Sequence, residues 1–120
     1  MKFLVLSIIA LIAIDPSKIA RVNNAKSEAR KAYMDGDYKK AVSRYTYLTD
    51  TLDVREDEVM INLANSYFQV KDTANAISTY QSLTASPKGH IRSKAQQQLG
   101  ILHHRQGKFE EAISIVPEKG

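Results

Sequence analysis

Residues 62–83, NLANSYFQVKDTANAISTYQSL, predict two short helices joined by a turn. On the first, Leu63, Ala64 and Tyr67 recur three and four residues apart, which places them on one helical face. The same spacing returns after residues 71–73, at Ala76, Ile77, Tyr80 and Leu83. Alanines leave room for two helices to cross closely, and the larger side chains fill the rest of the seam. A helix pair of this size cannot bury its apolar face alone, so the pattern predicts neighbouring pairs.

Copies of the pattern stand on both sides of this stretch. The earlier copy is offset by 35 positions and consists of Gly36, Tyr38, Ala41, Tyr45 and Leu48. The later copy is offset by 36 positions and consists of Leu99, Gly100, His103, Gly107, Phe109, Ala112 and Val116. The sequence therefore predicts three units, at residues 22–55, 57–90 and 93–120, of which the last is incomplete.

A period near 34 residues with this order of small and aromatic residues resembles the tetratricopeptide repeat (TPR). The run LG followed by RQGKFEEAI, within residues 99–113, is close to the family consensus. The resemblance covers residues 22–116 and implies an all-α fold, a TPR-type α-solenoid of antiparallel helix pairs with about three repeats. The departures are local, because Ala32 and His103 replace the usual first-helix aromatic and Lys71 replaces the turn glycine.

Caps and breakers predict the helix boundaries. Asp15 can cap a first helix that starts at Pro16 and ends at the turn of residues 35–37. We expect its partner at residues 38–52, a second pair at 56–70 and 73–84, and a loop at 85–89. The third pair is expected at 90–106 and 108–116. No segment predicts a β-strand, because apolar residues alternate nowhere for long.

The N-terminus carries an apolar run, FLVLSIIALIAI, at residues 3–14. A bilayer-spanning helix needs roughly 20 apolar residues and a signal-peptide core roughly 7 to 15. The run therefore favours export, and residues 1–20 are predicted to be a signal peptide or an N-terminal membrane anchor. Both remain open because no small-residue cleavage site is well formed; a buried core helix is the third reading. The predicted location is the bacterial periplasm or the inner membrane, with membrane contact through this segment only.

The amino-acid composition and the short motifs exclude several kinds of chemical site. The chain has no cysteine, which excludes disulfides and thiolate chemistry, and its net charge of +4 permits an acidic partner without demanding one. His103 and His104 are adjacent, so on a helix they point about 100° apart and cannot grip one metal ion together. Asp35, Gly36 and Asp37 lack the further ligands of a calcium loop. The sequence predicts a protein that is not an enzyme and holds no cofactor or metal.

The TPR resemblance implies a partner-binding groove, because in this family the first helix of each pair lines a concave side that holds peptides. Carried over position by position, the groove consists of Lys26, Arg30, Tyr33, Glu58, Ile61, Asn62, Asn65, Phe68, Gln69, Lys94, Gln97, Gln98, Ile101, His104 and Arg105. Exposed apolar members such as Phe68 and Ile101 favour contact with another molecule. Alternatively, they cover the inner packing of the superhelix or meet a further part of the array.

Some TPR proteins hold a peptide's terminal carboxylate with a set of lysines, asparagines and an arginine. Lys26, Asn62 and Lys94 match that set, but Arg30 and Gln98 depart from it, so we favour a general basic groove over a carboxylate clamp.

The runs at residues 62–83 and 96–113 also resemble the TPR proteins of bacterial aerotolerance (Bat) gene clusters. That resemblance implies an envelope scaffold beside membrane proteins with von Willebrand A-type domains. The predicted function is a non-catalytic scaffold or adaptor that binds a peptide or protein, and no nucleic acid. The alternative is a structural assembly protein that oligomerises through its open C-terminal repeat.

Overall fold

The computed structural model describes residues 15–107, and this part of the chain is helical throughout, without a strand. Its elements follow in the order α2 (Pro16–Met34), α3 (Tyr38–Thr46), the π-helical turn η1 (Tyr47–Thr51), α4 (Asp57–Gln69), α5 (Thr73–Leu83) and α6 (Gly89–Arg105). The prediction of an all-α chain is therefore confirmed for these residues. The apolar run at residues 3–14 and the expected helix at 108–116 lie outside the described residues.

Helix α2 begins where its capping residues predict. The Asp15 carboxylate accepts a hydrogen bond from the Ser17 backbone N–H at 3.0 Å, and Pro16 occupies the first turn, where its missing N–H has no cost. Hydrogen bonding from the Ser17 side chain lowers the pKa of Asp15, so the cap stays charged.

The turn after α2 is a Schellman motif, a hydrogen-bonded helix ending built on a left-handed residue. Gly36 donates its N–H to the Tyr33 carbonyl at 3.2 Å, and Asp37 donates to the Ala32 carbonyl at 2.9 Å. Gly36 has φ +76°, a left-handed conformation that costs other residues about 1–2 kcal/mol. Asp37 then caps α3, because its carboxylate accepts from the Lys40 N–H at 3.3 Å.

The same turn recurs after α4, and its left-handed residue recurs after α6. Asp72 donates its N–H to the Tyr67 carbonyl at 2.9 Å and then caps α5 through the Asn75 N–H at 3.3 Å. The left-handed position is Lys71, with φ +64°. After α6 it is Gly107, with φ +76°. The three left-handed residues are thus separated by the 35- and 36-residue offsets of the sequence pattern.

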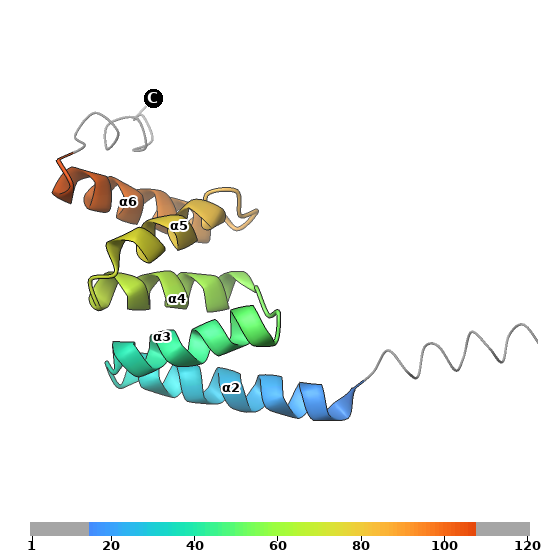
Figure 1. Ribbon diagram of the computed structural model, residues 1–120. Helices are drawn as coiled ribbons and strands as arrows, with labels where there is room; N and C mark the ends of the chain where they lie inside the picture. The colour runs from blue at the N-terminus through green and yellow to red at the C-terminus, as the bar shows by residue number, and fades with distance from the viewer. Residues whose placement is uncertain (1–14, 108–120) are drawn as a thin grey trace, which may run out of the picture.

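Successive helices pack on one another in chain order, as Figure 1 shows for the stack from α2 to α6. Small residues are fully buried in this packing, because Ala29 of α2, Ala41 of α3, Ala64 of α4 and Ala76 of α5 are all 0% exposed. A methyl group is the largest side chain that a close helix crossing accepts without displacing its neighbours. Gly100, at the corresponding place in α6, is buried too.

Two hydrophobic clusters form the core, one on each side of α4. Val59 and Leu63 pack into the cluster around α2 and α3, while Ile61 and Ala64 pack into the cluster around α5 and α6. Tyr67 contacts both clusters, so the core is continuous through α4. Each large apolar side chain buried in this way contributes about 1.5–3 kcal/mol relative to its exposed state.

The second helix of the first pair differs from its prediction. Residues 38–52 do not form one α-helix, because the α-helical pattern ends at Thr46 and a π-helical turn follows. In this turn Leu52 donates its N–H to the carbonyl five residues earlier, on Tyr47, at 3.1 Å. The wider turn buries Leu48, Thr49 and Leu52 together.

Candidate protein-binding groove

Helices α2, α4 and α6 alternate with α3 and α5 along the stack (Figure 1). Helix α4 contacts both α2 and α6. Side chains of α2 reach α4 in rising order along both helices, from Arg30 to Glu58 and from Tyr33 to Asn65. The two helices therefore run parallel, and their exposed faces form one continuous surface.

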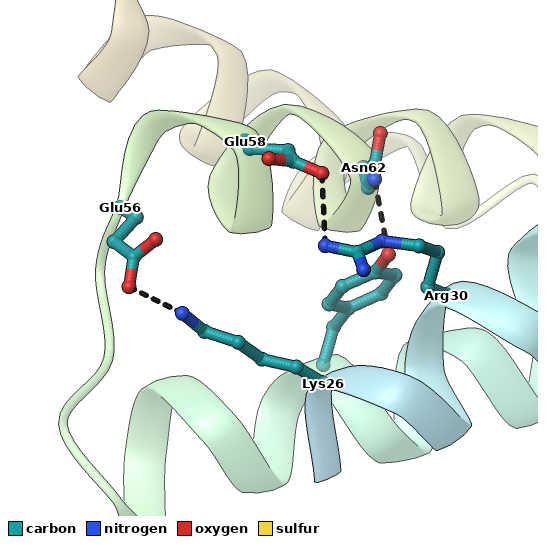
Figure 2. A network of polar contacts seen from close by, with 6 residues as sticks. Lys26, Arg30, Glu56, Glu58 and Asn62 are labelled. Atoms are coloured by element: carbon teal, nitrogen blue, oxygen red, sulfur yellow. Dashed lines mark hydrogen bonds and ion pairs between the residues drawn. The ribbon is translucent and has the colours of Figure 1, made fainter. Parts of the chain in front are cut away.

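The first depression on this surface, the Lys26 hollow, has a volume of about 20 Å³. It is lined by Lys26, Arg30, Tyr45, Glu56, Glu58, Val59 and Asn62. Two ion pairs bridge it, from Lys26 Nζ to Glu56 Oε1 at 2.6 Å and from Arg30 Nη2 to Glu58 Oε1 at 3.2 Å (Figure 2). Such exposed pairs contribute about 0–1 kcal/mol each to stability, so their main effect here is to neutralise the two cations.

The second depression, the Lys94 hollow, has a volume of about 170 Å³. It is lined by Tyr33, Tyr38, Asn65, Phe68, Gln69, Lys94 and Gln98. Lys94 is exposed and forms no ion pair with any residue of the described part of the chain. Beside the hollow, the Arg105 guanidinium lies over the Phe68 ring, 5.0 Å from its centroid, in a cation–π contact.

Tyrosine hydroxyls and side-chain amides form the floor of the groove. Asn62 donates from Nδ2 to the Tyr45 hydroxyl at 3.0 Å. One turn further along α4, Asn65 donates from Nδ2 to the Tyr33 hydroxyl at 3.0 Å and accepts from the Tyr80 hydroxyl at Oδ1. These bonds satisfy polar groups that would otherwise cost about 1–3 kcal/mol each when buried, and they fix the amides in place.

Burial keeps the Tyr45 and Tyr80 hydroxyls protonated. It raises the pKa of Tyr80 to about 12, and it raises the pKa of Tyr45 despite an opposing contribution from the Asn62 hydrogen bond. The Tyr33 ring packs edge-on against both Tyr38 and Tyr45, with centroid distances of 5.8 Å and 6.4 Å. The floor is therefore a rigid, uncharged layer below the two hollows.

The structure brings most of the predicted groove residues together. Those in the Lys94 hollow are Tyr33, Asn65, Phe68, Gln69, Lys94 and Gln98, and those in the Lys26 hollow are Lys26, Arg30, Glu58 and Asn62. Arg105 joins the first set through Phe68, and Gln97, Ile101 and His104 are exposed on α6.

Ile61 does not line the groove, because it is only 8% exposed and belongs to the core. Helix α4 contacts α2, α3, α5 and α6, so more than one of its faces is covered. The sequence reasoning missed Tyr38, Tyr45 and Glu56, which line the hollows. A tyrosine instead of phenylalanine at a buried position was the available signal, since its hydroxyl needs a partner.

Charge is distributed unevenly along the described chain. Residues 15–72 contain as many acidic as basic residues, whereas residues 73–107 contain Lys88, Arg92, Lys94 and Arg105 and no acidic residue. Two of the residues that line the Lys94 hollow, Lys94 and Gln98, come from this positive segment.

A third depression, of about 310 Å³, is lined by residues from the end of α3, η1, α4 and α5 and shares no lining residue with the two hollows. Within residues 15–107 no three His, Asp or Glu side chains are grouped so that they could hold a metal ion. Over the same residues, no helix combines the length and the apolar character that crossing a membrane requires. No protein-family model matches the chain, and no curated protein matches it.

Proposed function

We propose that this chain is a tetratricopeptide-repeat protein that acts as a non-catalytic scaffold, holding a peptide or a segment of a partner protein along α2, α4 and α6. The observation that carries the proposal is the Lys94 hollow, in which side chains from four helices, α2, α3, α4 and α6, converge on one open surface. Convergence of separate elements on a concave surface with a few placed polar groups is typical of binding sites.

The recurring turn supports the repeat assignment. Gly36, Lys71 and Gly107 hold the same left-handed position, and the alanine crossings within the first two pairs are equivalent. Repeats of this kind stack into a solenoid whose inner face comes from the first helix of each unit.

The chemistry of the surface supports a peptide ligand. Asn62, Asn65 and Gln98 supply amides at intervals along the groove, and such amides can bond to the main chain of an extended peptide. Phe68 and Ile101 add apolar surface, and the latter is 37% exposed. These groups provide recognition without a nucleophile, a base or a cofactor.

We place this scaffold in the bacterial envelope, exported or anchored by residues 1–20. The support is the apolar run at residues 3–14 and the resemblance to the TPR proteins of Bat gene clusters. On that resemblance, its partners include membrane proteins with von Willebrand A-type domains.

Peptide selection followed by NMR mapping tests the groove. Peptides selected from a random phage-displayed library are titrated into the isotope-labelled protein, and amide shifts are expected to move in α2, α4 and α6. Phe68→Ala should weaken binding, whereas Ser78→Ala, in the third depression, should not. Circular dichroism checks that both variants keep their helicity. Shift changes confined to α3 and α5, or equal effects of the two variants on peptide binding, would contradict the groove proposal.

Light scattering tests the alternative function. A scaffold of this kind binds peptide as a monomer, whereas an assembly protein forms a stable closed oligomer in the absence of any partner.

A further inference from the structure

We propose that the groove selects an acidic peptide segment whose carboxylates pair with Lys94 and Arg105 of α6, while Glu56 and Glu58 keep those carboxylates away from Lys26 and Arg30. This inference rests on the proposed groove function. It adds that the partner is negatively charged and that the α6 end of the groove binds its charges.

The two cations of the Lys26 hollow already have carboxylate partners. Glu56 Oε1 lies 2.6 Å from Lys26 Nζ, and Glu58 Oε1 lies 3.2 Å from Arg30 Nη2. The Lys26 side chain is only 26% exposed. An incoming carboxylate would have to displace one glutamate and would remain close to the other, and like charges at such distances repel.

The glutamates are held where they are by their position in the fold. Glu56 is the N-cap residue of α4, and Glu58 lies in the first helical turn. A negative side chain is stabilised at a helix N-terminus, by about 0.3–1 kcal/mol. The start of α4 also lies directly beside α2, so the carboxylate of its N-cap residue and that of its first turn both reach the cations of α2 (Figure 2).

The cations of helix α6 differ from those of the Lys26 hollow in their surroundings. Lys94, Gln98, Ile101 and Arg105 are spaced by four, three and four residues, which puts them on one stripe of the helix. Lys94 and Arg105 mark its ends, and neither forms an ion pair with a residue of the described chain. No acidic residue occurs between positions 73 and 107 to neutralise this stripe. Its positive field attracts anionic groups, and no carboxylate of the described part of α5 or α6 competes with them.

The stripe also sets the spacing of the ligand. Residues 94 and 105 are eleven apart, so their Cα atoms are separated by about 16 Å at a rise of about 1.5 Å per residue. An extended peptide spans that distance in about five residues. Between the two cations, Ile101 and Phe68 offer an apolar contact, and Arg105 already lies over the Phe68 ring. The preferred segment is therefore two acidic residues about five positions apart with an apolar residue between them.

Two matched substitutions test the assignment, since Lys26→Gln and Lys94→Gln remove the same charge from the two hollows. The probe is a synthetic peptide with two glutamates five positions apart and a leucine between them, followed by fluorescence anisotropy. Lys94→Gln should weaken its binding by about tenfold or more, because a charge-assisted hydrogen bond contributes about 1.5–3 kcal/mol. Lys26→Gln should change binding by less than about twofold, because that lysine is already paired.

The double variant Glu56→Gln, Glu58→Gln should bind the same peptide several times more tightly, because it frees Lys26 and Arg30. Replacing both glutamates of the peptide by glutamine should abolish the difference between the lysine variants. Equal losses in Lys26→Gln and Lys94→Gln, or no gain in the double variant, would overturn the inference. If the peptide with glutamines binds as well as the acidic one and its shifts still map to α2, α4 and α6, the acidic preference is wrong while the groove function stands. If shifts from neither peptide map to those helices, the groove function itself fails.

Discussion

The first helix pair, α2 and α3, and the second, α4 and α5, show which positions of a repeated unit are constrained. Equivalent residues at the crossings are identical, with Ala29 matched by Ala64 and Ala41 by Ala76, and all four are fully buried. The large core residues match as well, since Tyr45 and Leu48 have the same roles as Tyr80 and Leu83. The shape of a pair therefore depends on a few buried positions.

The two pairs differ wherever packing leaves freedom. The left-handed turn residue is Gly36 in the first pair and Lys71 in the second. The first pair ends in a π-helical turn, whereas α5 ends as an α-helix at Leu83. Ion pairs link the first pair to α4, but no ion pair links α4 or α5 to the described part of α6. The repeat thus keeps its frame while its surface chemistry changes from one unit to the next.

The largest effect is expected from truncating the matched leucines. Leu48→Ala and Leu83→Ala should each lower the free energy of unfolding by about 2–5 kcal/mol, because both side chains are almost fully buried. If the pairs are equivalent, the two losses agree within about 1 kcal/mol, as read from urea melts followed by circular dichroism. Val70→Ala, at a site 39% exposed, is the control and should change stability by less than about 0.5 kcal/mol. A large loss at one leucine with almost none at the other would show that the pairs pack differently.

At alkaline pH, Tyr45 of the first pair and Tyr80 of the second should affect the stability of the protein differently. The Tyr80 hydroxyl donates to Asn65 and therefore needs its proton, whereas the Tyr45 hydroxyl accepts from Asn62, which favours the ionised form. Burial raises the pKa of Tyr80 to about 12, against about 10 for an unfolded chain. Between these values the unfolded chain releases a proton that the folded chain keeps. Stability is therefore intact below pH about 10 and falls by about 2–3 kcal/mol as the pH rises through 12.

Urea melts at a series of pH values measure this loss. In Tyr80→Phe the alkaline loss should shrink strongly, and in Tyr45→Phe most of it should remain. The same alkaline loss in Tyr80→Phe as in the parent protein would contradict a buried, proton-donating Tyr80.

The smallest effect concerns the turns. Lys71 has φ +64°, so Lys71→Gly should raise the free energy of unfolding by about 1 kcal/mol. Gly36→Ala should lower it by a similar amount, and that loss isolates backbone strain, because a Cβ at Gly36 would meet no atom within 4 Å. Thermal melts of the two variants should therefore shift in opposite directions. A shift in the same direction would mean that the two turns are not equivalent.

Much of the helical frame was predictable from the sequence. Asp15 with Pro16, and Gly36 with Asp37, are local signals that act within one turn, so the bounds of α2 follow from them. The π-helical turn was not predictable, because residues 47–51 carry no proline or glycine and differ in no local signal from an α-helix.

For a single helix, the sequence allows the residues that share the groove-facing side to be predicted. The spacing of Asn62, Asn65 and Gln69 on α4 places them on one side whatever their neighbours are. The ion pairs of Glu56 and Glu58 depend on how closely α2 approaches α4, which a single sequence does not specify. The prediction that Ile61 lines the groove was wrong for a related reason, since the burial of Ile61 depends on α4 being covered on more than one side.

The central position of α4 implies a graded mechanical behaviour. Helix α4 has its main contacts with α2, α3, α5 and α6, whereas the main contacts of α2 within the described residues are with α3, η1 and α4. Under tension applied at the N-terminal side, the pair of α2 and α3 can come away while α4 stays clamped by its other neighbours. The molecule would then lengthen in separate steps, the first of which is the detachment of the α2–α3 pair.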